Sequence, residues 1–188
     1  ENIIKGLQNG AVELYHDNVN TLSTTNQGAE VKIATGNTRL RVHSDTTSSP
    51  APGIDLMRGT NDTFGADAYT DWSIVNSGAN LVISSAEDGS TNTRVTIDYS
   101  GRLLLGTTTE GHSNADDLTI ANSANCGLTI RSGTSNDGNI FFSDATSGNG
   151  ETVGTLKYSH TNNAFTFNTN GTTALTLDSS QNATFAGT

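Results

Sequence analysis

The sequence predicts an all-β protein built from short, repeated strands, and three observations lead to this fold class. Apolar residues recur at every second position, which is the period of a strand and not of a helix. Thr, Asn, Ser and Gly, which are poor residues for a helix interior, fill most positions between them. The second half of the chain repeats the alternation and the turn residues of the first half. We therefore expect elongated β modules that stack or intertwine.

The predicted strands are short runs bounded by Gly, Asn, Asp or Ser turn signals. In chain order they are residues 11–15, 30–33, 39–42, 54–57, 71–75, 80–84, 94–98, 102–105, 117–120, 127–130, 139–142, 154–158, 164–168, 174–178 and 183–185. Both prolines fall in residues 44–53, which we expect to form a loop because proline cannot continue a central strand. Residues 59–70 form the longest insertion. This spacing fits a sandwich, a barrel or a fibrous β stack.

The internal repeat divides the chain. Residues 95–98 match residues 175–178 at an offset of 80, and residues 72–83 match residues 156–167 at an offset of 84, so a four-residue insertion separates the two blocks. Further back, residues 53–56 match residues 127–130. We expect residues 1–37 to end an upstream β module, 38–109 to be copy one, 110–115 a connector and 116–188 copy two. Starting at Glu1 with no signal-peptide pattern, the chain is interpreted as a segment of a longer or processed polypeptide.

Composition limits the classes of function. Hydrophobic residues make up only 32% of the chain and charged residues 15%, which is too little apolar surface for a generous monomeric core. The net charge of −10 argues against nucleic-acid binding, because the electrostatic term would be repulsive. No apolar run approaches the ~18–20 residues of a membrane span, so no membrane insertion is expected. The lone Cys126 rules out an internal disulfide and is expected to be a small buried hydrophobe or, with less support, a contact between chains.

The acidic residues form no convincing catalytic pair. Asp98 and Asp178 hold equivalent repeat positions, each at the end of a predicted strand and one or two residues before a Ser. Aspartate at such a position bonds nearby backbone N–H groups, so we expect turn caps and not a glycosidase pair. The adjacent Asp116 and Asp117 are expected to lie on the solvated surface. No Ser or Cys sits in a nucleophile motif, and we expect no catalytic residues and no enzymatic activity.

Metal and cofactor sites are also not predicted. The four histidines, His16, His43, His112 and His160, show no ligand spacing within one chain, although identical histidines of a trimer could converge on its axis. Calcium is the one cofactor for which ligands are present, in the oxygen-rich residues 136–139 and 45–48. Neither segment matches an established calcium loop, so a turn is the favoured interpretation of both.

The aromatic residues fall into two groups. Four of them alternate with polar residues in predicted strands and are expected in the core: Trp72, Tyr158, Phe165 and Phe167. Phe64 and Tyr69 instead lie in the insertion of copy one, among Asn, Asp and Gly. Exposed aromatic rings in such surroundings are suited to gripping sugar rings. We therefore name Phe64 and Tyr69 as the candidate receptor contacts.

Three motifs resemble repeats of tail fibre proteins from marine tailed bacteriophages, especially cyanophages. They are G-A-V-E-L-Y-H-D-N at residues 10–18, D-Y-S-G-R-L-L-L-G-T-T at residues 98–108, and residues 154–178 with G-T-L-K-Y, A-F-T-F and L-T-L-D. The resemblance covers most of the chain and is specific for this class of appendage. It implies a parallel homotrimer exposed on the virion. In these fibres the second motif often precedes a C-terminal chaperone domain; this sequence contains none.

The expected function is therefore a non-enzymatic shaft or spacer of a phage tail fibre, with host-surface contacts through its loops. Expected partners are two further copies of the chain, other tail or virion proteins, and a host cell-surface glycan or protein. The expected location is the virion, outside cells. Alternatives are another virion appendage or capsid decoration protein, a bacterial extracellular adhesin or filament subunit and, with less support, a polysaccharide depolymerase.

Overall fold

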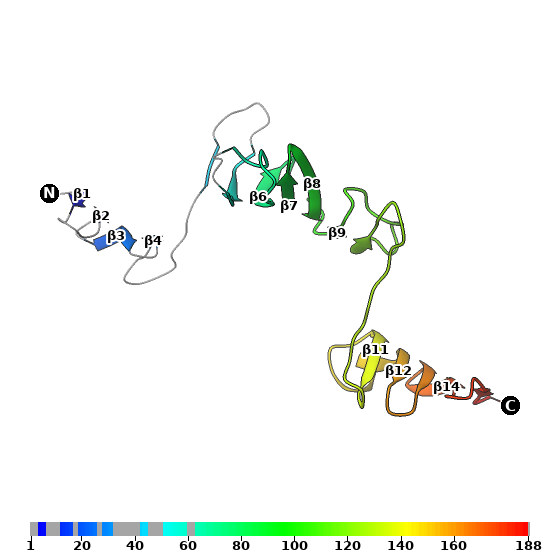
Figure 1. Ribbon diagram of the computed structural model, residues 1–188. Coiled ribbons are helices and arrows are strands. Elements are labelled where there is room, and N and C mark those ends of the chain that lie inside the picture. Colours follow the sequence, from blue (N-terminus) through cyan, green and yellow to red (C-terminus); the bar gives the residue numbers. More distant parts are fainter. Residues whose placement is uncertain are drawn as a thin grey trace. The chain divides into compact units, whose positions relative to one another are not determined.

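The regular elements of the computed structural model are almost all β-strands, which form three separate sheets (Figure 1). It describes residues 4–6, 12–16, 19–25, 28–31, 42–44, 51–59 and 63–187, and every structural statement below concerns these residues. The chain divides into two compact units, Glu1–Asn125 and Cys126–Thr188. We consider each unit by itself. The predicted all-β fold class is confirmed.

The first sheet contains β1 (Ile4–Gly6), β2 (Val12–His16), β3 (Val19–Thr25) and β4 (Gly28–Val31), paired antiparallel in chain order. One register row consists only of apolar residues, namely Ile4, Leu14, Leu22 and Val31. The alternation of residues 11–15 predicted β2, and residues 30–33 overlap β4. β1 and β3 were not predicted. β3 is rich in Thr, Asn and Ser, so its apolar alternation is weak.

The second sheet contains β5 (Gly53–Leu56), β6 (Asp71–Ser77), β7 (Asn80–Glu87), β8 (Ser90–Ile97), β9 (Leu103–Leu105) and β10 (Leu118–Ile120). All neighbours pair antiparallel except β9 and β10, which run parallel. Again one row is apolar throughout: Ile54, Ile74, Ile83, Val95, Leu105 and Ile120.

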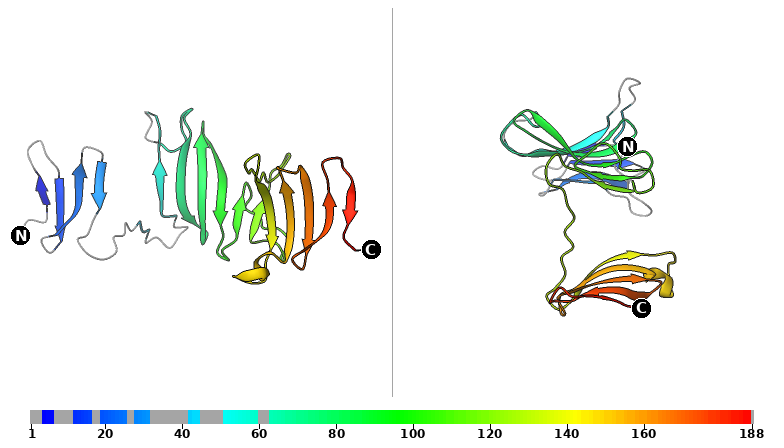
Figure 2. Two further views of the ribbon diagram at one scale, coloured as in Figure 1. Left: turned by 90° about the horizontal axis from the view of Figure 1, so that it is seen from below. Right: turned by 90° about the vertical axis from the view of Figure 1, so that its right-hand side faces the viewer.

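The third sheet belongs to the second unit. It contains β11 (Asp137–Phe142), β12 (Gly154–Ser159), β13 (Ala164–Thr169), β14 (Thr172–Leu177) and β15 (Ala183–Phe185), and a short 3₁₀ helix, η1 (Gly148–Thr152), joins β11 to β12. The strands lie side by side in antiparallel order (Figure 2). Its apolar row is Ile140, Leu156, Phe167, Leu175 and Phe185.

All three sheets contain the same one-residue register shift, directly after the apolar row. On β7 the partner passes from Val95 to Thr93, so Arg94 is left out of the ladder as the extra residue of a β-bulge. On β13 the corresponding extra residue is Ala174, and in the β2–β3 pair it is Thr21. The carbonyl oxygen of Arg94 accepts the N–H of Gly106 at 3.1 Å, and that of Ala174 accepts the N–H of Ala186 at 3.0 Å.

The hairpins beyond these bulges differ in length. The β7–β8 arms close at the pair Glu87–Ser90, and the β13–β14 arms close at Thr169–Thr172, each around a two-residue loop. Both loops, Asp88-Gly89 and Asn170-Gly171, have positive φ at both residues, as a type I′ turn requires. Counted from the bulge, each arm of the β7–β8 hairpin is two residues longer. This difference equals the four-residue step between the two sequence offsets.

Two strand predictions fail or fall outside the described residues. Residues 127–130 form no strand, and Leu128 is exposed; the neighbour of β12 is instead β11, because the apolar alternation of 139–142 supplies the paired row. Residues 39–41 lie outside the described part, and Val42 is in no strand. Copy two was expected to begin at residue 116, and this boundary stays a prediction; in the structure β10 pairs with β9, and the first compact unit extends to Asn125.

Candidate interaction surface

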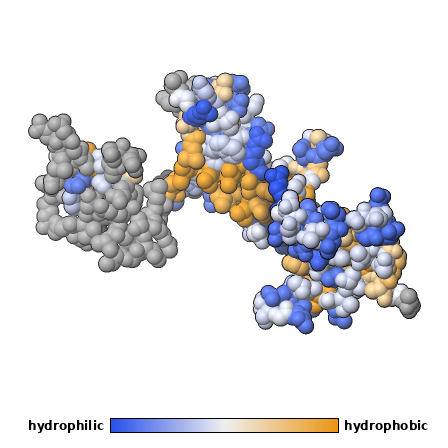
Figure 3. Space-filling view, turned by 60° about the horizontal axis from the view of Figure 1, so that its bottom comes forward, coloured by the Kyte–Doolittle hydropathy of each residue, from blue (hydrophilic) through white to orange (hydrophobic). Residues whose placement is uncertain are grey.

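The bulky apolar side chains of the second sheet lie together on one of its faces. Register and alternation place them there from every strand, and we call this set the β5–β10 apolar face. Its members are Ile54, Leu56, Trp72, Ile74, Leu81, Ile83, Val95, Ile97, Leu103, Leu105, Leu118 and Ile120. Figure 3 shows the hydrophobic patch that they contribute to the surface.

This apolar face is exposed in the single chain, whereas the opposite face is covered. Trp72, Ile97 and Leu118 are 42%, 40% and 52% exposed. On the opposite face, Ser73, Thr96 and Leu104 are only 6%, 3% and 1% exposed. A self-contained soluble domain normally buries the large apolar side chains of its sheets and leaves their hydroxyl groups in contact with water. The observed arrangement therefore leaves a contiguous apolar surface that needs a partner.

The third sheet has the same arrangement. We call its bulky side the β11–β15 apolar face, formed by Ile140, Phe142, Leu156, Tyr158, Phe165, Phe167, Leu175, Leu177 and Phe185. Phe142 and Phe185 are 63% and 68% exposed. The expectation that Trp72, Phe165 and Phe167 form a core is wrong for the single chain, where all three are exposed, and only Tyr158 is half-buried. The physical reason is that, among the described residues of either unit, no segment covers these faces.

Part of the opposite face of the second sheet is covered by residues 57–59 and 63–70, which Asp71 holds in place. The buried carboxylate of Asp71 accepts the N–H of Arg58 at 2.7 Å and that of Gly65 at 2.8 Å. Gly65 in turn packs against Ala86, where a Cβ atom would come within 2.5 Å of the alanine methyl. The hydrogen bond from Gly65, and then that from Arg58, lowers the pKa of Asp71.

The two candidate receptor contacts lie in this segment but differ in exposure. Phe64 is half-buried, while Tyr69 is exposed and lies under the Arg58 guanidinium, 5.0 Å from ring centroid to Cζ. Its N–H donates to Asp67 Oδ1 at 3.0 Å. Nothing in the structure brings Phe64 and Tyr69 into a common binding site. Their role in receptor contact stays a prediction.

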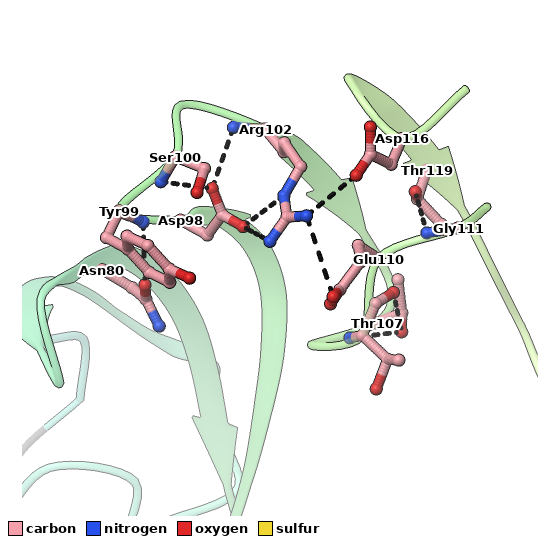
Figure 4. A network of polar contacts seen from close by, with 11 residues as sticks. Asn80, Asp98, Tyr99, Ser100, Arg102, Thr107, Glu110, Gly111, Asp116 and Thr119 are labelled. Carbon is pink, nitrogen blue, oxygen red and sulfur yellow. Dashed lines mark hydrogen bonds and ion pairs between the residues drawn. The ribbon is translucent and has the colours of Figure 1, made fainter. Parts of the chain in front are cut away.

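A second cluster, absent from the sequence-based expectations, surrounds Arg102 (Figure 4). Its guanidinium contacts Asp98 at 2.6 Å, Asp116 at 2.8 Å and Glu110 at 3.7 Å. Asp98 belongs to the turn between β8 and β9, while Glu110 and Asp116 belong to the segment that leads to β10. We call this cluster the Arg102 clasp. It fastens β10 where Leu103 N donates to the Asp117 carbonyl at 2.8 Å.

Electrostatics keep the clasp ionised. The bonds from Asp116 and then Asp98 raise the pKa of Arg102. Desolvation opposes ionisation of Asp98, but the N–H and guanidinium of Arg102 and the N–H of Ser100 together leave its pKa lowered. Asp116 was expected on the solvated surface, and that is wrong: its side chain is only 18% exposed, because it pairs with Arg102. Asp117 is exposed.

The predicted turn caps are confirmed. Asp98 Oδ1 accepts the N–H of Ser100 at 2.9 Å and of Arg102 at 3.0 Å. Asp178 Oδ1 accepts the N–H of Ser180 and of Asn182, both at 2.9 Å. The side chain and then the backbone of Asn182 lower the pKa of Asp178. Both carboxylates are therefore engaged with their own turns.

The remaining candidates offer no assembled site. His112 Nδ1 accepts the N–H of Asn114, the His160 ring packs edge-on against Tyr158, and His43 is exposed. A turn was favoured for residues 136–139, and that is wrong: residues 137–139 belong to β11, and Asn136 N–H instead donates to the Gly133 carbonyl at 3.0 Å in the turn that precedes this strand. Residues 45–48 lie outside the described part. Cys126 was expected to be buried but is exposed, because it lies in the segment without strands between β10 and β11.

Across the described ranges, no group of three His, Cys, Asp or Glu side chains is arranged to hold a metal ion. No helix within those ranges is long and apolar enough to cross a membrane. No protein-family model matches the sequence, and no curated protein matches it significantly. The exposed apolar faces are therefore the feature from which a function can be argued.

Proposed function

We propose that this chain is a structural segment of a phage tail fibre, without enzymatic activity, in which repeated β modules associate as a parallel homotrimer. The carrying observation is that the bulky apolar side chains of two sheets face solvent in the single chain while small polar side chains are covered. Joining copies through these faces would remove that surface from water at roughly 25 cal/mol per Å² of apolar area.

Two further observations support the proposal. The apolar row and the bulge that follows it recur in all three sheets, as expected of a fibre that repeats one module. The three sequence motifs resemble tail fibre repeats, and the third includes β13 and β14, the two strands that flank the bulge of the third sheet. Exposed loops such as the one that carries Tyr69 would then supply contacts to a host glycan or protein.

The proposal is tested by light scattering coupled to size exclusion, with negative-stain imaging of the same peak. A trimer mass on a rod-shaped particle is expected. Ile97→Asp places a charge on the β5–β10 apolar face and should shift the mass to a monomer, whereas Thr91→Asp, at an exposed polar position of the same strand, should leave it unchanged. A compact wild-type monomer would overturn the proposal.

A further inference from the structure

Arg94, the bulge residue of the second sheet, borders a polar hollow that includes no residue of the β5–β10 apolar face. The hollow encloses about 360 Å³ and is lined by Asn92, Thr93 and Arg94 of β8, by Gly106, and by residues 121–123 that follow β10. All of these residues belong to the first compact unit. We call it the Arg94 hollow. Its volume lies within the range of small-molecule sites, about 300–1,000 Å³.

The Arg94 side chain is held in a defined position at this hollow. Its Nε donates to Ser85 Oγ at 2.7 Å, and Ser85 is only 2% exposed, so the bond anchors the base of the guanidinium. Within the described part of the chain, Arg94 makes no ion pair, unlike Arg102. The guanidinium therefore keeps donors for a ligand from outside, and a bulge is a known means of re-aiming a side chain in this way.

The fold builds the rest of the hollow around that side chain. Ala121 N donates to the Leu105 carbonyl at 3.0 Å, which brings residues 121–123 beside β8. Gly106 has φ of +71°, and a Cβ there would lie 2.5 Å from the Ala121 carbonyl oxygen. Asn122 Oδ1 accepts the N–H of Ala124 at 3.3 Å, which fixes the orientation of the Asn122 amide.

The chemistry of the lining selects a class of ligand. The hollow contains one cationic group, amides and hydroxyl groups, and no acid, although the chain has 19 acidic and 9 basic residues. A guanidinium binds a carboxylate or sulfate through paired, charge-assisted hydrogen bonds. Asn, Ser and Thr side chains supply donors and acceptors suited to sugar hydroxyls. No aromatic ring lines the hollow, so a nucleobase would find no stacking partner.

We infer that the Arg94 hollow binds an acidic saccharide, with Arg94 on a carboxylate or sulfate group and the flanking amides and hydroxyls on the sugar ring. The site is complete within one chain. It therefore does not rest on the fibre or on the trimer, and a monomeric protein would leave it open to the same test.

The chain itself indicates the matched variants. Ala174 occupies the equivalent bulge of the third sheet with the same backbone hydrogen bond, so Arg94→Ala is compatible with the fold. Arg94→Gln removes the charge and keeps an N–H donor for Ser85. Arg131→Gln, at an exposed arginine of the other unit, is the control for general loss of positive charge.

The experiment is calorimetric titration of the full chain with a uronate hexasaccharide, a sulfated hexasaccharide, a neutral glucose hexasaccharide and inorganic sulfate. One acidic saccharide should bind, the neutral one should not, and the preferred acid identifies the source. Arg94→Ala and Arg94→Gln should each weaken binding about tenfold or more, since a hydrogen bond to a charged group is lost. Arg131→Gln should not change it.

Three results would overturn the inference. They are equal binding of the neutral hexasaccharide, unchanged affinity in both Arg94 variants, and inorganic sulfate binding as tightly as the sulfated sugar, which would indicate an anion site without saccharide recognition. Unchanged circular dichroism of the variants shows that lost binding is not lost folding.

Discussion

Asp71 is the residue on which the cover of the second sheet depends. Its carboxylate takes two backbone N–H groups, from Arg58 and Gly65, that no strand partner could satisfy. An ionised carboxylate accepts both bonds fully, whereas a protonated one keeps less acceptor capacity. The charged form is therefore favoured in the folded state, which lowers the pKa of Asp71.

The sign of the resulting pH dependence is fixed. Because the folded pKa of Asp71 is lowered, its stabilisation is fully present above the unfolded value near 3.9 and is lost as pH falls through the folded value. Asp71→Asn should therefore melt below wild type at neutral pH, and the difference should begin to narrow below about pH 4 and shrink further as pH falls through the folded value. Thermal melts from pH 7 to pH 2 check this. Asp55→Asn, at an exposed position of β5, is the control for removing one carboxylate from this sheet.

The two Asp-led turns differ at one residue with a left-handed backbone. Gly101 has φ of +85°, and the equivalent position in the β14–β15 turn is Gln181 with φ of +68°. A side chain is disfavoured at such φ by roughly 1–2 kcal/mol, which glycine avoids at an entropic cost of about 0.5–1 kcal/mol.

Exchanging these residues should have opposite effects. Gln181→Gly should raise the free energy of unfolding by about 0.5–1 kcal/mol, and Gly101→Gln should lower it by about 1 kcal/mol. Urea unfolding of both variants measures the difference. A stabilising Gly101→Gln would contradict the assigned backbone geometry.

Among the secondary-structure elements, β10 depends most on side chains far from it in sequence. It is a three-residue strand in a parallel pair, flanked by the hydrogen bonds from Leu103 N–H to the Asp117 carbonyl and from Ala121 N–H to the Leu105 carbonyl. The Arg102 clasp joins the turn before β9 to the segment before β10 and so fixes their register. The β14–β15 turn has Asn182 at the equivalent position, bonded at 3.0 Å to Asp178 alone, and no described strand pairs with the outer edge of β15.

Breaking the clasp should release β10 while sparing the antiparallel strands. Arg102→Gln removes the ion pairs with Asp98, Glu110 and Asp116, so amide hydrogen exchange at Leu103 and Ala121 should accelerate at least tenfold, while exchange within β7 should not change. Arg131→Gln is the matched control. Equal exchange in wild type and Arg102→Gln would show that pairing with β9 alone holds β10.

The sequence predicted most strands because apolar alternation and Asn-Gly or Asp-Gly turns are local signals. It also predicted the turn caps at Asp98 and Asp178, whose partners lie within four residues. It could not predict the Arg102 clasp, since Asp116 is 14 residues from Arg102 and only the β9–β10 crossover brings them together. The prediction of a strand at residues 127–130 failed because alternation alone does not show which of two neighbouring apolar runs will pair with the next strand.

At the scale of the whole molecule, the extent of apolar burial within one chain depends more on the position of the apolar side chains than on their number. A hydrophobic fraction of 32% suggested too little material for a monomeric core. Both described units then place that material on one face of a sheet and leave it exposed. The buried hydrophobic residues among those described are only Ala86 and Leu104. Stability of each unit should therefore depend strongly on association.

Association of such acidic chains is opposed by the electrostatic repulsion between their net negative charges. Each chain has a formal charge of −10, so three copies in the proposed trimer would have −30. The Debye length is about 8 Å at 0.15 M salt and about 30 Å at 0.01 M, so lowering the salt extends the repulsion across the whole assembly. We expect the assembly to loosen and its melting temperature to fall at low ionic strength. Because salt also strengthens apolar burial, the salt dependence of the melting temperature is compared with that of Ile97→Asp, which is expected to be a monomer. The salt dependence should be clearly larger in wild type, and a melting temperature unchanged from millimolar salt to seawater would contradict a charged assembly held by its apolar faces.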